Sequence, residues 1–264
     1  MAFFDCHFFS DALGLSVSAY VLLPQKSGDK TGAAGSGNED KCQTLYLLHG
    51  LSDDHTTWLR RTSIERYAAA RNLAVVMPAG DRSFYQDLAR GPRYWKFVSE
   101  ELIAISRQFF PLSAEPADTF AAGLSMGGYG ALRLGFAQPD QFAAVASLSG
   151  ALDIVRCVRE STHVNSLLPP EECAGIFGAK PKLEKSDSDL FFLSEKIAVT
   201  GRTRPMIYLA CGTEDSLLDD NRRFHRHLNR LHFEHTYIEE VGAHDWEYWD
   251  RQIQRVLDWL PLRK

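Results

Sequence analysis

The sequence of 264 residues lacks the features that mark several classes of protein. It has no run close to the roughly 18 apolar residues that a membrane-spanning helix needs. Its lysines and arginines are scattered and its net charge is −5, so neither nucleic acid nor a membrane is a predicted partner. The N-terminal residues have no basic stretch followed by an apolar segment of signal-peptide length. We therefore expect a cytoplasmic protein.

Cysteine is also scarce, and none of the five cysteines forms a C-x-x-C pair. An odd number without paired spacing favours reduced, structural thiols over a disulfide framework. His225, His227, His232 and His235 are close in sequence, which raises the alternative of a zinc site. His225 and His227 are two residues apart on an expected helix, however, and so face different directions. We predict no metal and no cofactor.

Hydrophobic residues make up 45% of the chain, enough to bury one large core. From residue 44 onwards, short apolar runs alternate with amphipathic segments, which is typical of parallel strands joined by helices on both faces of a sheet. We predict one α/β domain over residues 1–264. The predicted strands are Leu15–Leu23, as an antiparallel edge strand, then Thr44–Leu48, Ala74–Met77, Phe120–Ala122, Ala143–Ser147, Met206–Cys211 and His235–Glu239. The predicted helices are Ile64–Arg71, Tyr94–Phe109, Tyr129–Ala137, Arg222–Leu231 and Trp246–Leu260.

Two segments break this alternation. Residues 26–41 are rich in Gly, Ser, Asp and Asn and predict a mobile polar loop, with a domain linker as the alternative. Residues 152–204 carry Pro169, Pro170 and Pro181 between short helical pieces. We expect this second segment to form a cap over the functional site.

The most informative motif is Gly123-Leu124-Ser125-Met126-Gly127, which follows an apolar run and precedes a helix-like segment. In a strand, turn and helix arrangement the two glycines allow close backbone approach, and the serine is held on a sharp turn with its hydroxyl exposed. The N-terminus of the helix favours a developing negative charge. An ordinary tight turn is the alternative, but the context makes Ser125 a candidate nucleophile.

A serine nucleophile needs a base, and the base needs a carboxylate that orients it. Among nine histidines, His244 alone follows the last predicted strand and precedes the last amphipathic helix. It is therefore the candidate base. Glu214 and Asp215 both follow the strand Met206–Cys211, and either carboxylate could reach His244. We prefer Asp215, with Glu214 as the rival and an ordinary capping role for Asp215 as the further alternative.

Attack on an ester carbonyl creates an oxyanion, which backbone N–H groups can stabilise. Met126 directly follows the candidate nucleophile and supplies one such donor. Gly50 lies just after the strand Thr44–Leu48 and permits a tight turn that presents the N–H of Leu51 as the second. His49, beside this turn, is expected to be structural.

Four aromatic residues are expected near this site, on loops after strands or at helix starts: Trp58, Phe84, Tyr85 and Trp246. Such side chains could wall an acyl or aryl pocket, or they could equally belong to the core. No charged cluster accompanies them. The predicted substrate is therefore a small, uncharged acyl ester.

Five motifs occur in order along the chain: Leu-Leu-His-Gly-Leu at 47–51, Met-Pro-Ala-Gly-Asp-Arg-Ser-Phe-Tyr at 77–85, Gly-Leu-Ser-Met-Gly-Gly-Tyr-Gly-Ala at 123–131, Cys-Gly-Thr-Glu-Asp at 211–215 and Gly-Ala-His-Asp-Trp at 242–246. Together they resemble the esterase D-like carboxylesterases, and most of all the bacterial tributyrin esterases. S-formylglutathione hydrolases, feruloyl esterases and the antigen 85 mycolyltransferases are relatives. The resemblance covers nearly the whole chain from Leu45 onwards.

This resemblance implies an α/β-hydrolase fold with a mostly parallel central sheet. The roles that it implies are Ser125 as nucleophile, Asp215 as acid, His244 as base, and the backbone N–H groups of Leu51 and Met126 as oxyanion hole. It favours Asp215 over Glu214 because the family acid occupies the last position of the Cys-Gly-x-x-Asp pattern. Residues 52–54, Ser-Asp-Asp, stand where S-formylglutathione hydrolases usually carry a cysteine-containing loop, which weakens a thioesterase interpretation.

The sequence thus predicts a serine carboxylesterase that hydrolyses short-chain acyl esters through an acyl-enzyme on Ser125. The alternative hydrolases are an S-formylglutathione hydrolase and a feruloyl or acetyl-sugar esterase. An acyltransferase to a sugar or alcohol would use the same acyl-enzyme. An inactive binding protein on a hydrolase fold is the non-enzymatic alternative, since fold does not imply function. The expected partner is a small-molecule ester, and the chain could form a homo-oligomer.

Overall fold

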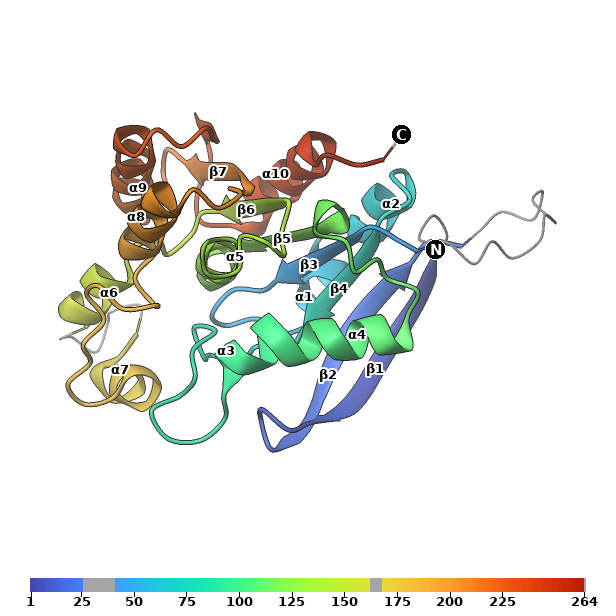
Figure 1. Cartoon of the computed structure of the whole chain (residues 1–264), viewed down its shortest axis with the longest axis horizontal. Helices are drawn as coiled ribbons and strands as arrows, with labels where there is room; N and C mark the ends of the chain where they lie inside the picture. Colours follow the sequence, from blue (N-terminus) through green and yellow to red (C-terminus); the bar gives the residue numbers. More distant parts are fainter. Residues whose placement is uncertain (26–40, 162–167, 264) are drawn as a thin grey trace.

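The computed structural model describes residues 1–25, 41–161 and 168–263. Apart from Lys41, the predicted polar loop 26–41 lies outside the described residues. The described chain forms an eight-stranded sheet with helices on both faces (Figure 1). The strand order is β1-β2-β4-β3-β5-β6-β7-β8. The strands are β1 Ala2–Ser10, β2 Leu15–Leu23, β3 Thr44–Leu48, β4 Ala74–Pro78, β5 Thr119–Leu124, β6 Ala144–Leu148, β7 Met206–Gly212 and β8 Thr236–Glu240.

Strands β3 to β8 all run parallel to one another, whereas β2 runs antiparallel to both β1 and β4. The predicted mostly parallel sheet is therefore confirmed. The prediction that Leu15–Leu23 is the edge strand is wrong, because β1 lies outside it. Sequence reasoning missed β1 because five of its nine side chains are exposed, so no apolar and polar alternation marks it.

The described helices are α1 Thr57–Arg61, α2 Ile64–Ala69, α3 Tyr94–Lys96, α4 Leu102–Phe109, α5 Met126–Ala137, α6 Ile154–Glu160, α7 Pro170–Phe177, α8 Leu190–Thr200, α9 Leu218–Arg230 and α10 Trp246–Trp259. The predicted helix Tyr94–Phe109 is divided into α3, a π-helical turn at Phe97–Glu101, and α4. Glu101 ends that turn, and its carboxylate accepts a hydrogen bond from the backbone N–H of Asp11 at 2.7 Å. This contact ties the turn between β1 and β2 to the helix.

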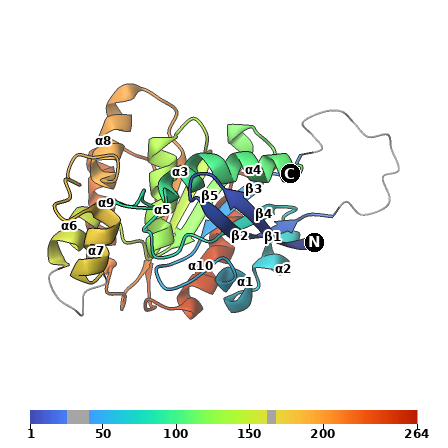
Figure 2. The ribbon, with the colours of Figure 1, turned by 90° about the horizontal axis from the view of Figure 1, so that it is seen from below.

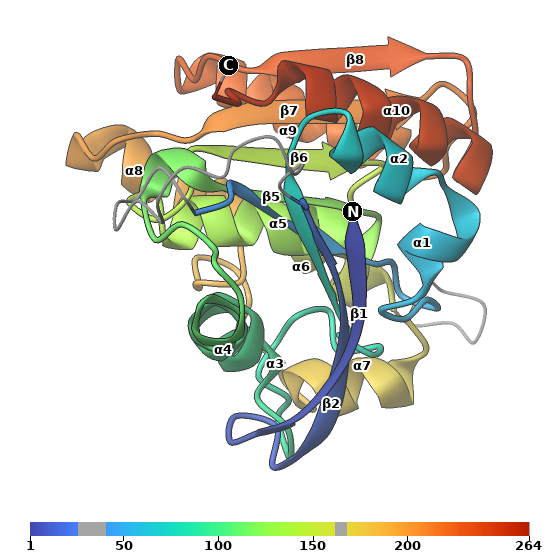
Figure 3. The ribbon, with the colours of Figure 1, turned by 90° about the vertical axis from the view of Figure 1, so that its right-hand side faces the viewer.

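Helices α1, α2 and α10 cover one face of the sheet, and α4, α5, α8 and α9 cover the other (Figures 2 and 3). Side chains alternate between the two cores along each strand: in β5, Phe120 and Ala122 join the first core and Ala121 the second. Every residue of β3, β4, β5 and β6 is buried. These strands read as continuous apolar runs because helices cover both sides of a parallel sheet.

The carboxyl ends of the parallel strands meet at one edge of the sheet, where ligand sites of α/β folds form. The loops that follow β3, β4, β5, β7 and β8 at this edge carry Leu51, Arg82, Ser125, Asp215 and His244 respectively. Segment 152–204 holds α6, α7 and α8, although residues 162–167 lie outside the described part; that it acts as a cap stays a prediction. No helix among the described residues combines the length and apolarity needed to span a membrane.

Candidate active site

Ser125 lies on a strained turn between β5 and α5, with φ of 52° and ψ of −116°, a backbone conformation that side-chain-bearing residues rarely adopt. The flanking glycines allow this turn. A Cβ atom on Gly123 would lie 2.4 Å from the carbonyl oxygen of Gly127, and a Cβ atom on Gly127 would lie 2.4 Å from that of Leu48. Only glycine fits at these two crossings, which hold the serine above the sheet edge.

His244 connects Ser125 to Asp215 by hydrogen bonds. Its Nε2 atom lies 3.0 Å from Oγ of Ser125, and its Nδ1 atom lies 2.9 and 3.1 Å from the two carboxylate oxygens of Asp215. Because a carboxylate can only accept, Nδ1 carries the proton and Nε2 is left to accept the serine proton. The structure thus brings together the three predicted side chains, whereas the rival carboxylate Glu214 is exposed.

The environment of Asp215 keeps it charged. Its side chain is fully buried, while that of His244 keeps 30% of its exposure and can meet a substrate. Burial by itself raises the pKa of Asp215, but hydrogen bonds from His244 and from the backbone N–H of Leu217, at 2.8 Å, hold that pKa below its ordinary 3.8. The carboxylate is therefore ionised at neutral pH and stabilises a protonated His244.

Ser149 and Trp249 support this pair, and sequence reasoning missed both. Ser149 is buried just after β6 with φ of 50°; it accepts a hydrogen bond from Nε1 of Trp249 at 3.0 Å, and its hydroxyl helps to lower the pKa of Asp215. The Trp249 ring meets the His244 imidazole edge-on, with centroids 4.9 Å apart. A signal was present, because Ser149 follows β6 as Ser125 follows β5, at the same sheet edge.

The turn after β3 is held by His49, which is 1% exposed. Its Nδ1–H donates to the carbonyl of Gly50 at 2.7 Å, and its Nε2 accepts from the N–H of Gly80 at 2.8 Å. Burial lowers the pKa of His49 below 6.5, so the neutral ring that this pattern requires is favoured. The hydroxyl of Tyr85 donates to the carbonyl of His49 at 3.0 Å. These contacts fix the turn that presents Leu51.

A pocket of about 490 Å³ opens at Ser125 and His244, within the size range of small-molecule sites. Trp246 and Trp249 contribute its aromatic lining, and Leu51 lines it as well. Three charged residues, Asp53, Arg82 and Asp245, also line it. The pocket thus combines apolar surface with the hydrogen-bonded serine and histidine.

Of the four predicted aromatic residues, Trp246 lines this pocket and the other three do not. Phe84 and Tyr85 are fully buried, and Trp58 is 1% exposed. The first two have positive φ angles, 51° and 49°, which turn the loop after β4 back toward the sheet. Trp58 donates from Nε1 to the carbonyl of Leu48 at 3.0 Å. The pocket-wall prediction is corrected for these three residues, which belong to the core beneath the site.

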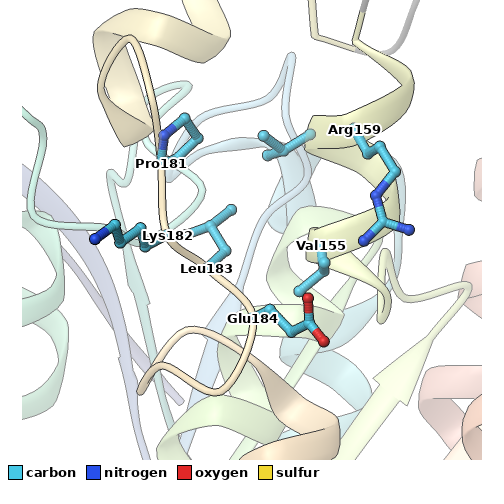
Figure 4. A pocket seen from close by; sticks show the side chains of 7 residues that line it. Val155, Arg159, Pro181, Lys182, Leu183 and Glu184 are labelled. Carbon is cyan, nitrogen blue, oxygen red and sulfur yellow. The ribbon is translucent and has the colours of Figure 1, made fainter.

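A second hollow, of about 570 Å³, lies within segment 152–204 (Figure 4). Val155, Val158 and Arg159 of α6 line one part of it, and residues 181–184 line another. Among the described residues, the two pockets share no lining residue.

The histidines near residue 230 pack with other side chains. His225 stacks on Tyr237, with ring centroids 4.1 Å apart, and its Nδ1 lies 2.8 Å from Nε2 of His235. His227 is buried against Phe191. In the described ranges, no group of three or more His, Cys, Asp or Glu side chains is placed to hold a metal ion.

The family described as putative esterase matches residues 10–260 of this chain. The chain belongs to this esterase family. A curated acetyl esterase from Caldicellulosiruptor saccharolyticus is 33% identical to this esterase over 262 residues, which are 98% of each chain. The resemblance to the esterase D-like family is thereby confirmed, whereas the closer likeness to tributyrin esterases stays a prediction.

Two solved structures from Staphylococcus aureus are similar to this esterase, each with 32% identity over 98% of both chains. One is fluorophosphonate-binding serine hydrolase F in a substrate-bound state, with a TM-score of 0.88. The other is the S-formylglutathione hydrolase FrmB without ligand, with a TM-score of 0.85. The predicted α/β-hydrolase fold is confirmed, and the protein is a serine carboxylesterase.

Proposed function

We propose that this esterase hydrolyses short-chain acyl esters through an acyl-enzyme on Ser125. The observation that carries the proposal is the continuous hydrogen-bonded chain from Ser125 through His244 to the ionised Asp215. His244 takes the hydroxyl proton as Oγ attacks the ester carbonyl, and then gives that proton to the departing alcohol. Water activated by His244 next attacks the acyl-enzyme and releases the acid. Asp215 stabilises the imidazolium in both halves of the reaction.

The backbone N–H groups of Leu51 and Met126 form the oxyanion hole in this proposal. Met126 is the first residue of α5, where an N–H group has no acceptor within the helix. Leu51 borders the pocket beside Ser125, and its N–H donates to no backbone carbonyl in the described part of the chain. Both donors are therefore available to a developing negative charge, and the anchored His49 keeps the Leu51 turn in place.

Two observations support a short, uncharged acyl group as the substrate. The relatives named above act, by their names, on acetyl and formyl groups. In addition, Glu172 pairs with Arg82, so the pocket presents no unpaired Arg82 cation that would select a carboxylate or phosphate. Trp246 and Trp249 supply the apolar contact for the acyl or alcohol part.

We further propose a reducing, cytoplasmic location. Cys6, Cys157, Cys173 and Cys211 form no disulfide. Secreted proteins more often pair their cysteines, because disulfides persist in oxidising compartments.

Hydrolysis of p-nitrophenyl acetate, butyrate, octanoate and ferulate, with S-formylglutathione in parallel, tests the substrate class. Serine-dependent turnover that is highest on acetate or butyrate is expected, and a preference for ferulate or for the thioester would assign the enzyme to those alternatives instead. Ser125→Ala and His244→Ala should each lose several orders of magnitude in kcat, by comparison with about 10⁶ for triad serine proteases. Retention of most activity by either variant would remove that residue from the mechanism.

Two further measurements separate the remaining alternatives. Product analysis with an acceptor alcohol present should yield free acid, whereas predominant transfer to the alcohol would indicate an acyltransferase. A fluorophosphonate should label wild type at Ser125 and leave Ser125→Ala unlabelled. Absence of labelling in wild type would support an inactive binding protein, because a serine without its base reacts poorly.

A further inference from the structure

Strand β1 is the outer strand of the sheet, and its free edge pairs with no other strand among the described residues (Figure 3). It nevertheless carries large exposed apolar side chains. Phe3, Phe4 and Phe9 keep 44%, 38% and 60% of their exposure, and Phe109 at the end of α4 keeps 55%. Phe109 packs against Phe8 of β1 with ring centroids 6.3 Å apart, so it extends the same apolar surface.

Apart from the charge of Asp5, β1 carries none of the usual features that protect an edge strand from pairing with another chain. Exposed edge strands are usually guarded by lysine, proline, a bulge or very short length. Strand β1 is nine residues long, contains no lysine, arginine or proline, and pairs with β2 residue for residue without a bulge. An unguarded edge of this length with exposed aromatic side chains is a surface suited to strand pairing.

The sequence of β1 is self-complementary about its middle residue, Cys6. From residue 3 to residue 9 it reads Phe-Phe-Asp-Cys-His-Phe-Phe. When two identical strands pair antiparallel about a two-fold axis at Cys6, residues equally distant from Cys6 face each other. Phe3 then faces Phe9 of the second copy, and Asp5 faces His7 of the second copy. Each aromatic ring thus meets a ring, and each acid meets a base.

Neighbouring registers lose this complementarity. A two-fold axis perpendicular to the sheet keeps each side chain on its own face of the sheet. The axis must therefore lie level with one residue of β1, because an axis between two residues would pair side chains from opposite faces. Centring it on Asp5 would place Asp5 opposite its own copy and Phe3 opposite His7. Centring it on His7 would place Phe9 opposite Asp5. Like charges directly opposite each other destabilise a strand pair, which leaves Cys6 as the favoured centre.

The second face of β1 supports the same register. On that face Phe4 would meet Phe8 of the second copy. Phe4 already contacts Phe110 at 5.1 Å between centroids, and Phe8 contacts Phe109. The C-terminal ends of the two α4 helices would therefore widen the contact beyond the strands, as a stable interface requires.

We propose that β1 forms the interface of a two-fold symmetric homodimer, in which the β1 strands of two copies pair antiparallel about Cys6 and join the two sheets into one. The contact is isologous and closes on itself, so it ends at a dimer rather than a fibre. Ser125, Asp215 and His244 follow strands in the opposite half of the sheet. Dimerisation therefore leaves both pockets open.

Sedimentation equilibrium of the full chain tests the interface. Wild type should be a dimer. Phe9→Lys should raise the dimer dissociation constant at least about 100-fold, because each of the two copies then brings a lysine into the interface. The matched control is Val199→Lys on α8, where the side chain is 85% exposed and far from β1 in the chain; it should leave the constant unchanged. Wild-type circular dichroism and esterase activity in both variants show that they fold.

Cross-linking tests the register. A short thiol-specific cross-linker should join two wild-type chains through Cys6 and should fail with Cys6→Ser. In the double variant Cys6→Ser, Phe4→Cys the new thiol faces Phe8 rather than its own copy, so no such cross-link is expected. The proposal is overturned by a wild type that stays monomeric at its highest soluble concentration, by a dimer that survives Phe9→Lys unchanged, or by cross-linking through residue 4 instead of residue 6.

Discussion

Arg82, on the loop after β4, forms a two-point ion pair with Glu172 of α7, with Nε–Oε1 and Nη2–Oε2 distances of 2.5 and 2.8 Å. Arg82 also lines the pocket at Ser125, so this pair joins the pocket wall to segment 152–204. The two side chains keep 48% and 25% of their exposure, and solvent therefore limits what the pair adds to stability. Its main effect is to offset a positive charge beside the substrate.

Glu172→Gln should change substrate charge preference more than stability. With Arg82 unpaired, the KM for mono-p-nitrophenyl succinate should fall about fivefold, the effect of one added charge near 4 Å in a solvated site. The KM for the uncharged butyrate ester should stay constant, and the free energy of unfolding should change by less than about 1 kcal/mol. Glu171→Gln, at the exposed neighbouring position of α7, is the control. Equal changes for both esters would refute this role of the pair.

Asp215→Asn should be far more damaging than Glu214→Gln. An amide cannot stabilise the protonated ring of His244 and favours the wrong tautomer, so we expect kcat to fall by about 10³ to 10⁴. Glu214→Gln should keep wild-type turnover because Glu214 is exposed and it is Asp215 that bonds Nδ1 of His244. Steady-state kinetics on p-nitrophenyl acetate measure both. Near-normal turnover by Asp215→Asn together with an inactive Glu214→Gln would reverse the assignment.

Gly127→Ala should unfold or distort the turn at Ser125. The added Cβ atom would lie 2.4 Å from the carbonyl oxygen of Leu48, a buried backbone atom, so the backbone must shift at a cost of about 3 kcal/mol or more. Gly175→Ala in α7 is the matched control, since a Cβ atom there meets nothing within 4 Å. That variant should gain about 0.5 to 1 kcal/mol. Urea denaturation compares the two, and equal unfolding energies would contradict the steric argument.

Stability should fall on mild acidification. Burial lowers the pKa of both His49 and His227 below the ordinary 6.5. As the pH falls below 6.5, the unfolded chain binds protons that the folded chain does not. The free energy of unfolding therefore falls as the pH is lowered and is greatest above pH 6.5. Urea denaturation at about pH 7.5 and about pH 5.5 measures this slope. His227→Gln should reduce this slope, and an unchanged slope in that variant would contradict the assignment.

Local sequence was sufficient to predict the strand and helix alternation and to select Ser125 and His244. Ser125 lies between two glycines, at each of which an added Cβ atom would lie 2.4 Å from a backbone atom. The motif can therefore be recognised from the sequence without knowledge of the fold. His244 and Asp215 follow apolar strands, and the carboxyl ends of parallel strands share one edge. The choice between Glu214 and Asp215 came from family resemblance, because two adjacent carboxylates on one loop differ only in which way they point.

Other features depended on contacts between segments distant in sequence. The inward turn of Phe84 and Tyr85 follows from positive φ angles that no propensity indicated. Strand β1 was missed because phenylalanines lie on its exposed side, so its sequence does not alternate between apolar and polar residues. Trp249 supports Ser149 across 100 positions of the chain, and Ser149 in turn supports Asp215.

The amino-acid sequence alone determined the class of fold, the nucleophile and the base, since periodicity and turn geometry are local properties of the chain. The tertiary structure decided which carboxylate meets His244, which aromatic residues line the pocket, and which strand is left at the edge of the sheet. Those outcomes depend on the direction of each side chain, and direction is set by packing against residues far away in the sequence.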